Sequence, residues 1–164
     1  MPERNIKYLI EDYKSIRDRT IEFLNKVPEE KWTWKPHDLL GSFGMQVRHM
    51  CTSQQSYIEG IKKGKMDFSQ KDFDKEIETN KEKAIARLKE LDNQLFELIS
   101  QLKNYDKEII FVDGVSGTSK ETLINVMNYI IEHEFIIKAF LLVMVGLQGW
   151  ANSFLCDICF THLN

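Results

Sequence analysis

The histidines offer the clearest chemistry in this chain, because imidazole both binds divalent metal ions and titrates near neutral pH. The sequence of 164 residues contains four of them. His133 lies in the run EHEFIIKAF, which is otherwise becoming steadily more apolar, and His49 lies in SFGMQVRHM. A metal site would require these side chains, together with further ligands, to meet in the folded chain.

Helical spacing suggests where the two imidazoles point. At 100° per residue, His133 shares an inward face with Val126, Tyr129, Ile130, Ile137, Phe140 and Met144, whereas Glu132, Glu134 and Lys138 lie off the centre of that face. His49 falls on a stripe of small or uncharged residues: Ser42, Gln46, Ser53, Ser56 and Gly60. Such a stripe could line a cleft or could simply allow close helix packing. Considered alone, an inward histidine is more often a core residue with one satisfied hydrogen bond than a metal ligand.

A second cluster with ligand chemistry lies near the C-terminus, in CDICFTH. Cys156, Cys159 and His162 would share one side of a helix, and thiolate with imidazole suits zinc. A single C-x-x-C pair also fits ordinary packing of two small side chains, and that interpretation is favoured. His37, in WKPHD, is expected in a loop.

Hydrophobic periodicity predicts the helices that must position these residues. Apolar residues spaced by threes and fours predict a helix over residues 5–27, and Ser42 is expected to cap a second helix that runs to about Lys63. A polar linker over residues 64–74 leads to a third helix with a four-three seam: Ala84, Leu88, Leu91, Leu95, Leu98 and Leu102.

The sequence before the last long helix predicts an extended conformation instead of a helix. The run Ile109–Val112, followed by Asp113-Gly114 and Gly117, indicates an extended segment with a turn, which could form a small hairpin. Thr118 or Ser119 should then cap a fourth helix that reaches about Val145. The predicted fold is an all-α, up-down four-helix bundle with a short extended segment before the last long helix.

Composition excludes several classes of function. The net charge is −3 and no segment concentrates basic residues, so nucleic acid is not an expected partner. No signal peptide is evident and the three cysteines lack a disulfide-framework spacing, which predicts a cytoplasmic protein with free thiols. The uncharged run 139–156 is too polar in its second half to span a membrane. Its first half, residues 139–147, is more apolar than one bundle face requires, which would suit a homodimer.

Three segments resemble the DinB/YfiT-like superfamily of small four-helix bundles: KVPEEKWTWKP, SFGMQVRHM and NYIIEHEFIIKAFLL. The last is similar to the fourth-helix motif E-H-E-x-H-H-K/R-G-Q. The resemblance implies one bundle domain over residues 1–149. Residues 150–164 are a tail or a short fifth helix, either part of that domain or disordered.

The resemblance also implies a metal site. Members of that superfamily hold nickel or zinc with one histidine from the second helix and two, at i and i+4, from the fourth. His49 and His133 match two of these ligands, but the third position is Ile137. Ile136 likewise stands where a histidine is usual. Gln46, Tyr129 and the C-terminal cysteines are the conceivable substitute ligands, and Ser53 would line the pocket beside them.

The sequence therefore predicts a degenerate metal site with no metal at full occupancy. We expect a small-molecule-binding or non-catalytic member of the superfamily. The alternative is a divalent-metal-dependent hydrolase, or an S-transferase that uses a low-molecular-weight thiol such as bacillithiol.

Overall fold

Four long helices form the protein. The computed structural model describes residues 5–37, 40–68, 74–105, 108–113 and 117–147. The long helices are α1 (Ile6–Lys26), α2 (Phe43–Lys63), α4 (Lys81–Gln101) and α5 (Leu123–Leu147). A 3-10 turn, η1 (Glu29–Lys31), and a one-turn helix, α3 (Glu76–Thr79), lie in the connections. The predicted all-α four-helix bundle is confirmed.

Polar caps fix the helix ends. Asn5 accepts a hydrogen bond from the Tyr8 N–H at the start of α1, and Ser42 accepts one from the Met45 N–H at 3.2 Å at the start of α2. α2 ends at Gly64, whose φ of 73° is left-handed and favours glycine. The bounds predicted for the second helix are therefore confirmed.

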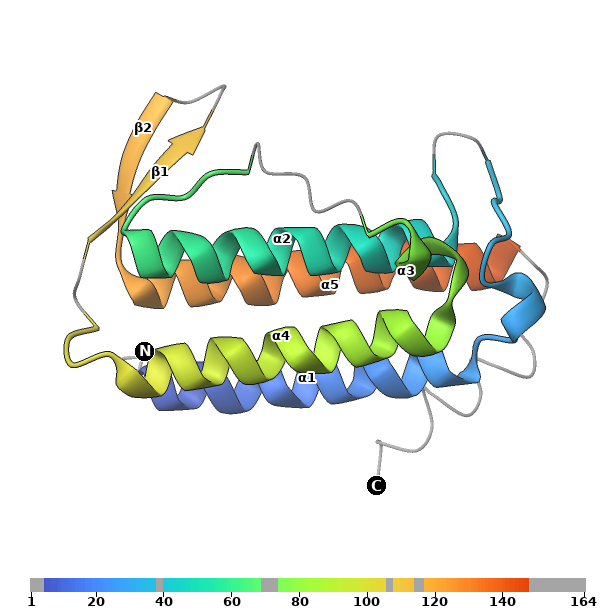
Figure 1. The fold of residues 1–164 in the computed structure, drawn as a ribbon, viewed down its shortest axis with the longest axis horizontal. Helices are drawn as coiled ribbons and strands as arrows, with labels where there is room; N and C mark the ends of the chain where they lie inside the picture. Colours follow the sequence, from blue (N-terminus) through green and yellow to red (C-terminus); the bar gives the residue numbers. More distant parts are fainter. Residues whose placement is uncertain (1–4, 38–39, 69–73, 106–107, 114–116, 148–164) are drawn as a thin grey trace.

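The path of the chain differs from a simple up-down order. Backbone hydrogen bonds join Gly64 and Met66, just after α2, to Ile110. The strand containing Ile110 also follows α4, so α2 and α4 both end at this end of the bundle. α1 packs against α5, and α2 packs against both α4 and α5. Figure 1 shows α1 and α5 running one way and α2 and α4 the other. The predicted alternation holds within the pairs α1–α2 and α4–α5, but not between α2 and α4.

A β-hairpin precedes the last helix. β1 (Ile109–Asp113) pairs with β2 (Gly117–Glu121) in an antiparallel register that places Phe111 opposite Ser119. The prediction that Thr118 or Ser119 caps the fourth helix is therefore wrong, because both residues belong to β2. Thr122 takes that role, accepting a hydrogen bond from the Asn125 N–H at 3.3 Å. Pairing with the apolar strand β1 outweighs the local capping preference of Thr118 and Ser119.

The apolar core lies between the four helices and includes the seam of α4. Ala84, Leu88, Leu91 and Leu95 are fully buried, while Leu98 is partly buried against them. The connection 28–41 is anchored by Trp32, which is buried and donates a hydrogen bond from Nε1 to the Ile77 carbonyl at 3.2 Å. Among the described residues, no helix is both long and apolar enough to cross a bilayer.

Leu91→Ala and Leu95→Ala should each lower the free energy of unfolding by about 2 to 5 kcal/mol, because each removes a fully buried side chain and leaves a cavity. Asn93→Ala, on the exposed side of the same helix, is the matched control and should change it by less than about 0.5 kcal/mol. Chemical denaturation measures all three. Small losses for both leucine variants would mean that the seam does not pack in the core.

Candidate functional site

His49 and His133 meet at the edge between α2 and α5. Their Nε2 atoms are 3.1 Å apart, and the ring centroids are separated by 5.0 Å at an interplanar angle of 60°. His49 is exposed and His133 is half-buried. The pair therefore lies at the margin of the bundle and not in its centre.

The inward direction predicted for His133 needs correction. The buried side of α5 consists of Leu123, Val126, Met127, Ile130, Ile131, Glu134, Ile137, Leu141, Met144 and Val145. Tyr129 and Phe140, which were expected on the inner face, are exposed. The buried face is thus rotated toward Glu134, and His133 lies at its border, where it can reach α2.

Both imidazoles favour the neutral form. Loss of hydration lowers the pKa of His133 to about 4, with further contributions from the nearby His49 and Arg17. The pKa of His49 is lowered in the same way by partial burial and by Arg48. At neutral pH one ring can therefore donate its N–H to the lone pair of the other, which accounts for the short contact.

The spacing of the two nitrogens also suits two ligands of one ion. With metal–nitrogen bonds of about 2.0 to 2.1 Å, two ligands subtending 90° lie roughly 2.9 Å apart, and two at a tetrahedral angle roughly 3.3 Å apart. The observed 3.1 Å falls between these values. Geometry alone would thus allow His49 and His133 to coordinate a divalent ion from adjacent positions.

The third ligand position does not fit a metal. Ile137 follows His133 by one helical turn and is buried, so an alkyl side chain occupies the place where a ligand would be required. Among the residues that the structure describes, no group of three or more histidines, cysteines, aspartates or glutamates could hold an ion. Two imidazoles are one ligand short of the three protein ligands that catalytic zinc sites use.

The substitute ligands within the described residues are engaged elsewhere. Gln46 donates a hydrogen bond from Nε2 to the Leu40 carbonyl at 2.5 Å. Tyr129 packs against Phe111 of the hairpin, with ring centroids 5.5 Å apart, and its hydroxyl bonds to Glu121. Ser53 is half-buried on α2, one turn after His49, and could contact a ligand at the pair. That Gln46, Ser53, Tyr129 and Ile137 line a pocket at the histidine pair stays a prediction.

A buried polar cluster lies behind the histidines and joins all four long helices. Arg17 of α1 donates from Nη2 to the Tyr13 hydroxyl at 2.6 Å and to Oε1 of Gln54 on α2 at 2.8 Å. Its Nε lies 3.3 Å from Oδ1 of Asp92 on α4, and its Nη1 lies 3.3 Å from Oε2 of Glu134 on α5. All five side chains are buried. We name these residues the Arg17 cluster.

The cluster is closed by further hydrogen bonds. Tyr13 and Gln54 each donate to Oδ1 of Asp92, at 2.8 Å. Burial raises the pKa of Glu134 despite the attraction of Arg17, and burial also raises the pKa of the Tyr13 hydroxyl. One guanidinium therefore faces two carboxyl groups, and burial favours the protonated form of Glu134.

Sequence reasoning missed the charged members of this cluster. Arg17 is one of several charged residues between the apolar positions of the first helix, and Asp92 directly follows Leu91 of the leucine seam. Neither residue therefore stands out in the sequence as a buried charge. A usable signal was present, since Tyr13, Arg17 and Thr20 follow the i, i+4, i+7 spacing of one face. Gln54 is also buried, among the apolar residues of α2.

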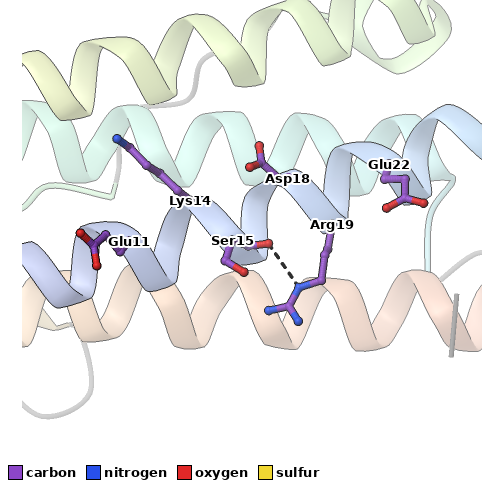
Figure 2. A pocket seen from close by; sticks show the side chains of 6 residues that line it. All are labelled: Glu11, Lys14, Ser15, Asp18, Arg19 and Glu22. Carbon is purple, nitrogen blue, oxygen red and sulfur yellow. Dashed lines mark hydrogen bonds between the residues drawn. The ribbon is translucent and has the colours of Figure 1, made fainter. Parts of the chain in front are cut away.

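The remaining candidates do not add to the histidine pair. Cys156, Cys159 and His162 lie outside the described residues, while Cys51 is buried in the core of the bundle. Figure 2 shows a surface hollow lined only by α1: Glu11, Lys14, Ser15, Asp18, Arg19 and Glu22. Its charges alternate in sign, and it contains neither histidine nor cysteine. It is the solvated face of α1.

The chain belongs to the DinB superfamily, whose family model matches residues 12–136, about three quarters of the sequence. The match includes His49 and His133 and ends directly before Ile137. Among proteins with curated descriptions, none has a sequence that matches this chain.

Two solved structures from Bacillus subtilis share the fold. The DinB-like protein YjoA is 24% identical, with a TM-score of 0.63, and the alignment covers 86% of this chain and 91% of that one. YfiT, described as a probable metal-dependent hydrolase with an unusual four-helix bundle topology, is 14% identical, with a TM-score of 0.71 and coverage of 92% and 93%. At these identities the likeness shows the fold alone.

NMR titration of the metal-free protein should show His133 protonating near pH 4 and His49 below its ordinary 6.5. His49→Gln should raise the pKa of His133, because it removes one neighbouring charge. Since the unfolded chain binds this proton at about pH 6.5, folding stability should fall as the pH drops from about 6.5 to about 4. His133→Gln should weaken that pH dependence. Titration of His133 at its ordinary pKa would contradict its partial burial beside His49.

Arg17→Met should lower the free energy of unfolding by about 3 to 5 kcal/mol, because it leaves the carboxyl groups of Asp92 and Glu134 buried without their cation. Glu134→Gln should cost less, since burial already disfavours the charge that it removes. Arg19→Met, on the exposed face of α1, is the control and should have little effect. Equal losses for the two arginine variants would show that the Arg17 cluster does not contribute specifically.

Proposed function

We propose that this DinB-superfamily protein is a non-catalytic, small-molecule-binding member whose metal site is degenerate. The observation that carries the proposal is the buried Ile137, one turn from His133, at the position where a third ligand would be needed. Coordination through two imidazoles alone would leave a divalent ion weakly held and exchangeable.

The chemistry of the pair supports binding of a neutral ligand. Two neutral imidazoles present one N–H donor and one lone pair within 3.1 Å, at an edge open to solvent through His49. A ligand with an adjacent donor and acceptor, such as a carboxamide or an alcohol, could replace the mutual hydrogen bond of the rings. The Ser53 hydroxyl and the Ile137 side chain would supply a polar and an apolar contact beside it.

The alternative function is metal-dependent hydrolysis or transfer of a low-molecular-weight thiol. The nitrogen spacing favours it, because 3.1 Å suits two ligands of one ion, and YfiT, described as a probable metal-dependent hydrolase, has the same fold. This alternative requires a further ligand that the described residues do not supply. The cytoplasm remains the compartment that we propose.

A thermal-shift screen of the untagged protein separates the two functions. The non-catalytic proposal expects stabilisation by neutral polar compounds and little response to nickel, zinc or thiols. His49→Gln and His133→Gln should each abolish the response to a compound that binds at the pair. A large response to metal with none to any neutral compound would favour the alternative.

Ile137→His should rebuild a three-imidazole site. In the presence of a chelator the variant should be less stable than the parent, because a polar ring replaces a buried alkyl group. Zinc or nickel at 100 times the dissociation constant should then stabilise it by about 2.7 kcal/mol, by mass action on the folded form. Ile136→His, at the neighbouring exposed position, is the control and should gain no tight site. Calorimetry and melting with and without metal measure both effects. If the parent binds one ion per chain as tightly as Ile137→His does, another residue completes the site and the proposal is wrong.

A further inference from the structure

The edge between α2 and α5 continues from the histidine pair toward the hairpin. Tyr57 follows His49 by about two helical turns, and Tyr129 precedes His133 by about one. Because α2 and α5 run in opposite directions, both tyrosines lie toward the hairpin end of the bundle (Figure 1). This part of the edge does not include the contact between the two imidazoles.

Four aromatic side chains pack in a row at this end, and we name them the aromatic row. Tyr57 of α2 contacts Phe68, which lies just after that helix, with ring centroids 5.3 Å apart. Phe68 contacts Phe111 of β1 at 6.1 Å, and Phe111 contacts Tyr129 of α5 at 5.5 Å. The row joins the hairpin to the bundle, yet Phe68 is 44% exposed and Tyr129 is 36% exposed. Aromatic ring surface therefore faces the solvent.

Two carboxylates flank the aromatic row. Glu132 is exposed, and Glu121 accepts hydrogen bonds from Ser119 at 3.1 Å and from Asn125 at 2.9 Å. In the part of the chain that the structure describes, neither carboxylate forms an ion pair with a lysine or an arginine. Loss of hydration raises the pKa of the Tyr129 hydroxyl, and both carboxylates raise it further. Negative charge is therefore in excess at this edge.

The Tyr57 hydroxyl lies near Glu132 and forms no hydrogen bond with another described residue. Tyr57 is only 8% exposed. Burial raises the pKa of its hydroxyl to about 12, and the nearby Glu132 and Tyr129 contribute in the same direction. Buried polar groups in folded proteins normally have a hydrogen-bond partner. A ligand at this edge can supply that partner.

We propose that this edge binds the protonated amine of a small molecule, with Tyr57, Tyr129 and Glu132 as the residues that contact it. An ammonium group has three N–H donors and no acceptor. It would donate to the Tyr57 hydroxyl oxygen and to the Glu132 carboxylate, and the exposed ring of Tyr129 would attract its positive charge. The alkyl chain of the amine would lie against Phe68.

Other classes of ligand fit this edge less well. An anion would be repelled by the two carboxylates. A divalent metal ion would lack ligands, because the described residues contain no group of three or more histidines, cysteines, aspartates or glutamates that could hold it. A neutral apolar compound would leave the Tyr57 hydroxyl without a partner and the charge of Glu132 uncompensated. Charge complementarity therefore favours an organic cation.

Binding of butylammonium to the full-length protein tests the proposal, with butan-1-ol as the uncharged analogue of similar shape. NMR chemical shifts of the ring protons of Tyr57, Phe68 and Tyr129 report binding at neutral pH, where the amine is protonated. Butan-1-ol should bind about tenfold more weakly than butylammonium or not at all, because it lacks the charge. Added salt should weaken the binding of butylammonium by screening its attraction to Glu132.

Three variants identify the groups that hold the amine. Glu132→Gln should weaken butylammonium binding about tenfold because it removes the carboxylate, and Tyr57→Phe should weaken it severalfold while it keeps the ring. Glu97→Gln, exposed on α4, is the matched control and should bind as the parent does. Backbone amide spectra verify that each variant is folded. Equal binding of butylammonium and butan-1-ol by the parent, or unchanged butylammonium binding in Glu132→Gln or Tyr57→Phe, would overturn the proposal.

Discussion

The buried guanidinium of Arg17 is the constraint on which the arrangement of the bundle depends. It contacts Gln54 of α2, Asp92 of α4 and Glu134 of α5 from its place on α1, so one side chain relates all four long helices. A buried ion pair of this kind is weak evidence for high stability, because both charges lose their hydration. Its stronger effect is geometric, since a slip or rotation of any one helix would leave a buried polar or charged group without its partner.

The rotation of α5 follows from this contact. With Glu134 directed at Arg17, the 100° step between neighbouring residues turns His133 toward α2 and Phe135 toward the outside. Ile137, one turn from both Glu134 and His133, is carried into the buried face. The same contact that brings His133 to His49 therefore also buries Ile137, the residue on which the proposed loss of a third ligand rests. The two neutral rings then satisfy each other.

Local signals in the sequence predicted much of the fold. The cap at Ser42, the stop at Gly64 and the leucine seam of α4 depend on neighbouring residues, and each is found where it was expected. The parallel course of α2 and α4, the β-pairing of Thr118 and Ser119, and the burial of Arg17, Asp92 and Glu134 depend on contacts between distant segments. No helical wheel contains that information. A charged residue appears solvated until its partner on another helix is known.

The candidate site likewise depends on a contact between distant segments that local sequence signals do not predict. The resemblance to the DinB/YfiT-like superfamily singled out His49 and His133, which lie 84 positions apart in the sequence, and spacing along the chain could not have paired them.

Metal analysis of the untagged full-length protein after exhaustive dialysis tests the central claim most directly. A degenerate site predicts far less than one divalent ion per chain, with no change in His133→Gln. About one nickel or zinc ion per chain, lost in His133→Gln, would contradict it.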